Sequence, residues 1–162
     1  MGLDQYLTAK KYVSQWDYSA GYEDRWQTQD FIDLLPLDAP DLTAHGGHSG
    51  ITVEYPIGYW RKANAVHGWF VTELGEGVDD CREMYVDRKQ LKDLRNRAQK
   101  VLHADNIEAE AERQGLTTTK GFFFGSYDYD EWYVEDLKKT VAICNAALRL
   151  PESYSIHYQA SW

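Results

Sequence analysis

Alternation of apolar and polar residues predicts strands near both ends of the chain. In residues 5–13 one face carries Tyr6, Thr8, Lys10 and Tyr12, and the other carries Leu7, Ala9 and Val13. This period of two is typical of a half-buried strand. Residues 51–55, which Pro56 closes, and residues 154–162 are expected to form two more strands, and residues 83–86 a short one.

Apolar spacings of three and four residues predict three amphipathic helices. The first covers residues 58–74, the second follows an expected capping box of Asp87 and Gln90, and the third begins near Asp128 and Glu131. Their apolar stripes are Trp60, Ala63, His67, Phe70 and Leu74; Leu91, Leu94, Ala98 and Val101; and Val134, Leu137, Val141, Cys144 and Leu148. Residues 107–114 predict a short polar helix that Gly115 ends, and residues 121–125 a short buried strand.

This order of elements predicts an α+β fold, with a mostly antiparallel sheet and about three amphipathic helices packed on it. The 162 residues have the length of a single domain. Residues 14–50 have the composition of an insertion, which is acidic over residues 17–41.

Charge and cysteine content narrow the classes of function and the compartment. The net charge of −9 argues against direct binding to nucleic acid but permits a basic protein partner. No apolar run is long enough to span a membrane and no secretory signal is visible, so the chain is expected to stay inside a reducing cell. Cys81 and Cys144 are therefore expected to be thiols.

Two segments combine aromatic and polar groups in a way that suits a ligand site. In the first, Trp60 could stack on a planar ring, Arg61 and Lys62 could hold a phosphate, and Asn64 adds an amide. In the second, Tyr127, Tyr129 and Trp132 form an aromatic cluster before the third helix. The alternative for the first segment is that Arg61 and Lys62 are only solvated, and for the second segment that its side chains form helix caps and core.

A third group of residues would carry chemistry if the protein were an enzyme. His67 could transfer protons, and Asp79, Asp80 and Cys81 in one turn could hold a metal ion or supply a nucleophile. The alternatives are a core histidine and a polar turn. No phosphate-loop, dinucleotide-binding, nucleophile-elbow or zinc motif is present, so no cofactor or metal is expected.

Residues 82–100 are the one basic stretch of the chain. Arg88, Lys92 and Arg95 line up beside the apolar stripe of the second helix. We expect a solvated helix face here, with contacts to phosphates or to an acidic partner as the alternative.

The chain contains the five blocks MGLDQYL (1–7), GYWRKANAVH (58–67), VDDC (78–81), GFFFGS (121–126) and DEWY (130–133). Together these blocks resemble a widespread family of small phage and prophage proteins. The acidic segment 14–50 is not part of the resemblance. The resemblance implies a phage origin and an accessory role inside the infected bacterium, and it transfers no catalytic residues.

These observations leave three functions open. The first is a counter-defence protein that binds a small host ligand, such as a signalling nucleotide, without turning it over. The second is an inhibitor that binds a host protein through its acidic surface, and the third is an enzyme that acts on a nucleotide or a protein. Strands at both ends of the chain could also pair across a two-fold axis, which is a common route to homodimers.

Overall fold

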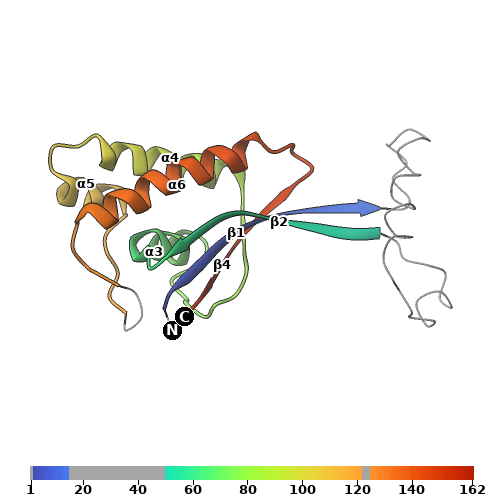
Figure 1. Ribbon diagram of the computed structural model, residues 1–162, viewed down its shortest axis with the longest axis horizontal. Coiled ribbons are helices and arrows are strands. Elements are labelled where there is room, and N and C mark those ends of the chain that lie inside the picture. Colours follow the sequence, from blue (N-terminus) through green and yellow to red (C-terminus); the bar gives the residue numbers. More distant parts are fainter. Residues whose placement is uncertain (1, 15–49, 122–124) are drawn as a thin grey trace. The chain divides into compact units, whose positions relative to one another are not determined.

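The computed structural model describes residues 2–14, 50–121 and 125–162 (Figure 1). The chain divides into two compact units, one of Met1–Ala9 with Tyr55–Trp162 and the other of Lys10–Glu54. The acidic stretch 17–41 and most of the predicted insertion lie outside the described residues, as does the centre of the predicted strand 121–125. The cavity and the polar network analysed below belong to the first unit.

The described strands form a four-stranded antiparallel sheet in the order β2-β1-β4-β3. The strands are β1 (Asp4–Ser14), β2 (Gly50–Arg61), β3 (Met84–Val86) and β4 (Ser155–Ser161). Alternate residues of β1 and β4 are buried, among them Leu7, Ala9, Ile156 and Tyr158. One face of the sheet therefore supplies the core, which is the arrangement that the alternation in the sequence predicts.

In the described part of the chain four helices accompany the sheet, so the α+β prediction is confirmed, with one helix more than the three amphipathic ones. They are α3 (Asn64–Glu73), α4 (Arg88–Leu102), α5 (Ile107–Gln114) and α6 (Glu131–Arg149). None of the helices in the described part of the chain is long and apolar enough to cross a membrane.

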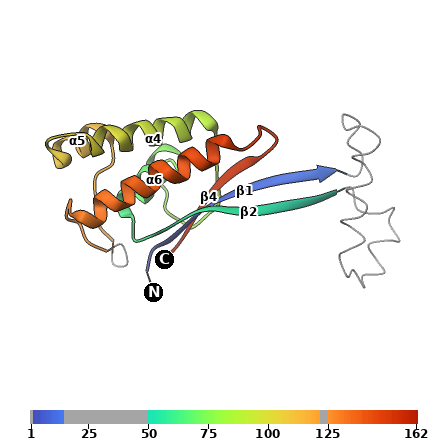
Figure 2. The ribbon, with the colours of Figure 1, turned by 45° about the horizontal axis from the view of Figure 1, so that its top comes forward.

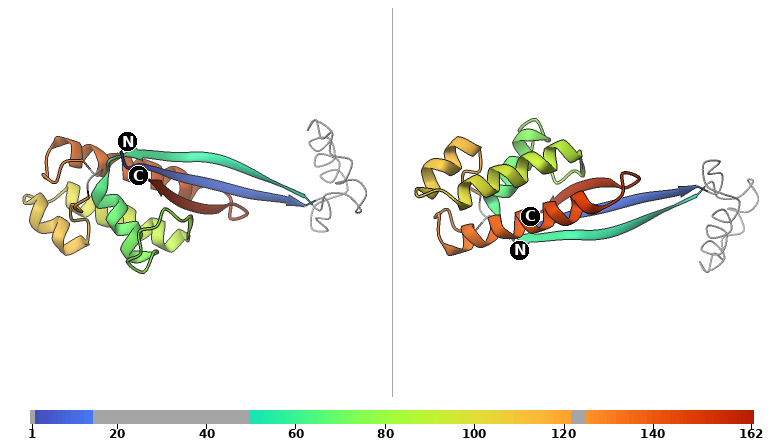
Figure 3. Two further views of the ribbon diagram at one scale, coloured as in Figure 1. Left: turned by 90° about the horizontal axis from the view of Figure 1, so that it is seen from below. Right: turned by 90° about the horizontal axis from the view of Figure 1, so that it is seen from above.

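Helices α3 and α6 both contact the sheet. The ring of Phe70 on α3 stacks on Tyr158 of β4 with 3.7 Å between centroids, and the indole of Trp60 on β2 donates to Thr140 of α6 at 2.9 Å. Figures 1 and 2 show α4 running beside α6. Figure 3 shows that α5 and the beginning of α6 lie at the same end of the unit, where Tyr133 donates to the carbonyl of Leu116 at 2.8 Å.

The most local of the sequence predictions are confirmed in detail. Asp87 and Gln90 form the expected capping box, and all four residues of the α4 stripe are 0% exposed. The short helix over residues 107–114 ends at Gly115, whose φ of 66° is in the left-handed region that favours glycine. Both described cysteines are free thiols, Cys144 being buried and Cys81 half-buried.

One predicted element boundary is wrong. Strand β2 continues past Pro56 to Arg61, and the helix expected from residue 58 begins at Asn64, because the pairing of β2 with β1 extends the strand. The third helix begins at Glu131 as expected, but its cap is Asp130, which accepts from the amides of Trp132 and Tyr133, whereas Asp128 lies in the preceding loop.

The arginines of the basic stretch bind the protein itself. Arg88 donates to the carbonyls of Leu148, Leu150 and Pro151 and so satisfies the C-terminal end of α6. Arg95 is half-buried and donates to the side chain of Asn145 at 3.4 Å, and Arg97 forms ion pairs with Glu73 and Asp93. The expectation of a solvated face is therefore wrong for Arg88, whereas Lys92 is exposed.

Candidate functional site

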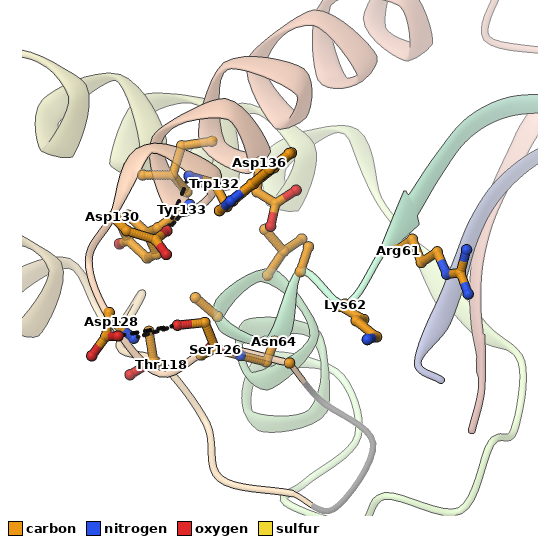
Figure 4. Close-up of a pocket in the computed structure, with 15 residues that line it drawn as sticks. Arg61, Lys62, Asn64, Thr118, Ser126, Asp128, Asp130, Trp132, Tyr133 and Asp136 are labelled. Atoms are coloured by element: carbon orange, nitrogen blue, oxygen red, sulfur yellow. Dashed lines mark hydrogen bonds between the residues drawn. The ribbon is translucent and has the colours of Figure 1, made fainter. Parts of the chain in front are cut away.

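A cavity of about 350 Å³ lies where the end of β2, the start of α3, the loop before α6 and the first turns of α6 meet (Figure 4). This size falls at the lower end of the roughly 300–1,000 Å³ that is usual for small-molecule sites. The polar and aromatic residues that line it are Arg61, Lys62, Asn64, Thr118, Ser126, Asp128, Asp130, Trp132, Tyr133 and Asp136.

Among the described residues, the cavity has one accessible aromatic face. Trp132 is 78% exposed, and it is the most exposed large hydrophobic side chain of the described residues. Its neighbour Tyr133 is buried, and its hydroxyl is bound to the carbonyl of Leu116. Burial raises the pKa of the Tyr133 hydroxyl, which therefore stays protonated. Trp132 is free to stack on a planar ligand, whereas Tyr133 forms part of the wall.

Three carboxylates line the cavity and differ in what they bind. Asp130 caps α6, and Asp128 lies 3.4 Å from the hydroxyl of Ser126. Asp136 is half-buried, and within the described part of the chain its carboxyl group has no hydrogen bond or ion pair. Burial raises its pKa to about 6, with the Lys139 ammonium opposing and Asp130 adding to the shift. Asp136 is thus the carboxylate with free hydrogen-bonding capacity.

Positive charge lies at the opposite end of the cavity. Figure 4 shows the side chains of Arg61 and Lys62 leading away from the three carboxylates. Both are exposed. Lys62 has a φ of 63°, which is unusual for a residue other than glycine, and its amide donates to the carbonyl of Leu3 at 2.7 Å. Such backbone strain persists where the surrounding structure imposes it, and it is common at binding sites.

Asn64 holds the wall of the cavity together. Its Nδ2 donates to the carbonyl of Ser126 at 2.7 Å, and its Oδ1 accepts from the amide of Thr119 at 3.0 Å. The side chain is buried at the start of α3. It therefore fixes two parts of the loop 117–126 on α3, and its contribution to a ligand site is to position that loop.

Of the seven predicted ligand-binding residues, the structure brings Arg61, Lys62, Asn64 and Trp132 to one cavity. The other three lie elsewhere. Trp60 is 0% exposed in the core, so its ring is closed to a ligand. The hydroxyl of Tyr127 bonds to the carbonyl of Gly121, and the ring of Tyr129 packs on Tyr133 with 4.9 Å between centroids.

Sequence reasoning missed Asp136, Thr118 and Ser126. Thr118 and Ser126 belong to a loop whose course the sequence does not reveal. Asp136 had a usable signal, since it follows Trp132 by four residues on a predicted helix and thus lies on the same side. A charged residue beside the buried Tyr133 and Leu137 is the pattern that could have indicated it.

The residues predicted for an enzyme split into two groups. His67 is 1% exposed, and its Nε2 lies 3.0 Å from Oδ2 of Asp79. Its Nδ1 lies 2.8 Å from the hydroxyl of Tyr158, which donates to Oε1 of Gln5 at 3.1 Å. Burial and the nearby Asp79 and Cys81 raise the pKa of Tyr158 well above its ordinary value, so this hydroxyl remains a donor. Both ring nitrogens of His67 are therefore engaged.

This buried network extends in both directions. Gln5 also donates to the carbonyl of Ala63 at 3.2 Å, and the indole of Trp162 donates to Oδ1 of Asp79 at 3.1 Å. The network joins β1, α3, the turn after α3 and β4. We call Gln5, His67, Asp79 and Tyr158 the buried network, and its evident role is to fix these elements together.

Asp80 and Cys81 do not share the hydrogen bonds of this network. Asp80 accepts from the amide of Arg82 at 3.2 Å and forms an ion pair with its guanidinium. Cys81 has a φ of 61°, and its carbonyl accepts from Gln159. Among the residues that the structure describes, no group of three or more metal-ligating side chains comes together.

Comparison with known proteins adds no relative to this description. No protein-family model, curated protein or solved structure matches the chain significantly.

Proposed function

We propose that the protein binds a small, nucleotide-like ligand in the cavity between β2, α3 and α6, without turning it over. The observation that carries this proposal is the pairing of an exposed indole with a half-buried carboxylate in one cavity: Trp132 and Asp136. A ring stacked on Trp132 would place its edge near the carboxylate. Lys62 and Arg61, at the other end, would meet an anionic group.

The bipolar lining favours a ligand that is itself bipolar. A simple anion would be repelled by Asp128, Asp130 and Asp136. A simple cation would leave the positive end unused. A nucleotide has hydrogen-bond donors on its base and a phosphate at its other end, and it therefore matches both ends of the cavity.

The biological role that we propose is accessory and phage-derived, following the resemblance of the five sequence blocks. A phage protein that binds a host signalling nucleotide would lower its free concentration in the cytoplasm of the infected bacterium. Binding alone is sufficient for this role.

One observation makes the enzyme alternative less favoured. His67 is 1% exposed, so its imidazole is held in the core. An inhibitor acting through its acidic surface would use residues 17–41, which lie outside the described residues. The cavity is the site that the described residues support.

Thermal melting against a panel of mono-, di- and cyclic nucleotides tests the proposal. A ligand at 100 times its dissociation constant stabilises a protein by about 2.7 kcal/mol, which shifts the midpoint by several degrees. We expect such a shift for the wild-type protein and its loss in Trp132→Ala. Tyr85→Ala is the matched control, because Tyr85 is 61% exposed and does not line the cavity.

The same samples test turnover. Chromatography of the nucleotide after incubation should return it unchanged. Conversion of the nucleotide would show an enzyme, and no shift with any member of the panel would contradict the binding proposal.

A further inference from the structure

The two residues that define the cavity chemically are fixed relative to each other by one helix. Trp132 and Asp136 are four residues apart in α6, so their side chains leave the same side of the helix about one turn apart. Figure 4 shows both against the cavity. A planar ring that stacks on the indole would therefore have its edge within reach of the carboxylate.

Asp136 is the carboxylate that could form hydrogen bonds with the edge of such a ring. Asp130 already accepts two backbone amides, and Asp128 is exposed beside Ser126. The nearby ammonium of Lys139 lies over the ring of Tyr59, 5.5 Å from its centroid. The Asp136 carboxyl is half-buried and, among the described residues, lacks a hydrogen-bond partner. A ligand donor would satisfy it.

An ionised carboxylate has a defined preference among the nucleobases, because it offers two acceptors and no donor. Guanine carries two adjacent donors, N1–H and the N2 amino group, on its Watson–Crick edge. Adenine presents one donor beside one acceptor, cytosine presents one donor beside two acceptors, and uracil presents one donor between two carbonyls. Only guanine among them can donate two parallel hydrogen bonds to one carboxylate.

We propose that Asp136 binds the Watson–Crick edge of a guanine stacked on Trp132, and that the cavity thereby selects guanine nucleotides. This inference rests on the proposed function and specifies the class of ligand that the site takes. Asp136 acts as the specificity-determining residue, and Trp132 supplies affinity for any base.

The burial of Asp136 supports the same assignment and adds a dependence on pH. Its pKa is raised to about 6, so the group is ionised at pH 7.5 and accepts only. Below pH 6 it becomes a carboxylic acid with one donor and one acceptor, which no longer favours guanine. The other charged groups that line the cavity or adjoin Asp136 are Arg61, Lys62, Asp128, Asp130 and Lys139.

Calorimetric titration with the monophosphates of guanosine, inosine, adenosine and xanthosine, which differ only in the base, tests the inference. Guanosine monophosphate should bind the wild-type protein roughly ten- to a hundredfold more tightly than the inosine or adenosine forms at pH 7.5, since one charge-assisted hydrogen bond is worth that much. Inosine lacks only the N2 amino group. At pH 5 the preference should shrink.

The variant Asp136→Asn provides a more specific test of the inference. An amide offers one acceptor and one donor, which match N1–H and the C2 carbonyl of xanthine. We expect the variant to lose the preference for guanosine monophosphate and to bind xanthosine monophosphate at least about tenfold better than the wild-type protein does. Asp128→Asn is the matched control on the same cavity and should leave the preference unchanged.

The outcomes separate the two proposals. Equal binding of all four nucleotides by the wild-type protein, with loss of binding in Trp132→Ala, would overturn the guanine inference and leave the proposed function intact. A preference that Asp128→Asn removes and Asp136→Asn retains would also overturn the inference. No binding of any nucleotide would overturn both.

Discussion

The cavity beside α6 and the buried network around His67 use similar side chains in opposite ways. In the network, the imidazole and hydroxyl groups lie in the core, and each hydrogen bond joins one element to another. In the cavity, the carboxyl group of Asp136 is half-buried and has no described partner, and the indole of Trp132 is exposed. A satisfied polar group stabilises the fold, whereas one with unused capacity costs stability until a ligand arrives.

This difference reverses the order in which the sequence suggests these residues as candidates for function. His67, Asp79 and Cys81 are the residue types most often found in catalytic sites, yet the structure uses His67 and Asp79 to connect elements. Asp136 is one of 26 acidic residues and carries no motif, yet it is the carboxylate with free capacity in the cavity. The contrast can be tested by substitutions in each region.

The largest effect is expected from breaking the buried network. Tyr158→Phe removes one hydroxyl and with it the buried hydrogen bonds of that hydroxyl to Nδ1 of His67 and Oε1 of Gln5. We expect a loss of roughly 2–4 kcal/mol in the free energy of unfolding. Chemical denaturation measures it, and Tyr85→Phe on the surface is the control. Below its melting temperature the variant should still bind ligand normally. A loss under 0.5 kcal/mol would show that the network does not hold the fold.

The next effect belongs to the cavity and should spare stability. Trp132→Ala removes a side chain that is 78% exposed, so the free energy of unfolding should change by less than about 0.5 kcal/mol. The binding free energy of a nucleotide should become less favourable by about 1–3 kcal/mol, which is the usual cost of losing an aromatic partner for one base. Calorimetry on the folded variant measures this. Unchanged affinity would place the ligand elsewhere.

A smaller effect with a defined pH dependence is expected at Asp136. Its folded pKa of about 6 is above its unfolded value, so burial of the neutral acid contributes stability below about pH 4, and this contribution is lost as the pH rises through 6. At pH 7.5 the ionised group therefore costs stability. Asp136→Asn should raise the melting temperature by a few degrees at pH 7.5 and by nothing at pH 3.5. An equal shift at both pH values would contradict the burial of this carboxyl.

The smallest effect is expected from the positive end of the cavity. Arg61 and Lys62 are exposed, and exposed charge pairs are worth about 0.2–1 kcal/mol. The double variant Arg61→Gln with Lys62→Gln should lower the affinity for a nucleoside monophosphate about two- to fivefold and leave the affinity for the nucleoside unchanged. The difference in affinity between the variant and the wild-type protein should shrink in 0.5 M salt. Equal weakening of nucleoside and nucleotide would show that these residues shape the cavity and do not bind the phosphate.

The predictable part of the fold was the part that local chemistry decides. The capping box at Asp87, the stripe of α4 and the strand β1 depend on neighbours in the sequence, and each is where the pattern indicates. The start of α3 was not predictable in this way. Trp60 fits a helical stripe with Ala63, but the pairing of β2 with β1 extends the strand to Arg61.

The candidate site was predictable only in part, for a similar reason. Arg61, Lys62, Asn64 and Trp132 were identified from the chemistry of their side chains, and the fold brings them to one cavity. Trp60 could not be told from Trp132 by chemistry, because only packing decides that one indole is buried and the other exposed. The spacing of four residues places Asp136 on the same side of the helix as Trp132, but the lack of a described partner for its carboxyl depends on the groups that the fold brings around it.

One measurement examines both regions at once. The indole N–H of each of the six tryptophans gives its own signal in a nitrogen-15 correlation spectrum. Trp132 reports the cavity, and Trp162, which donates to Asp79, reports the buried network. On titration with guanosine monophosphate, we predict that the Trp132 signal moves and that those of Trp162 and the core residue Trp60 stay in place. Movement of Trp162 with a stationary Trp132 would contradict the assignment of binding to the cavity and of structure to the network.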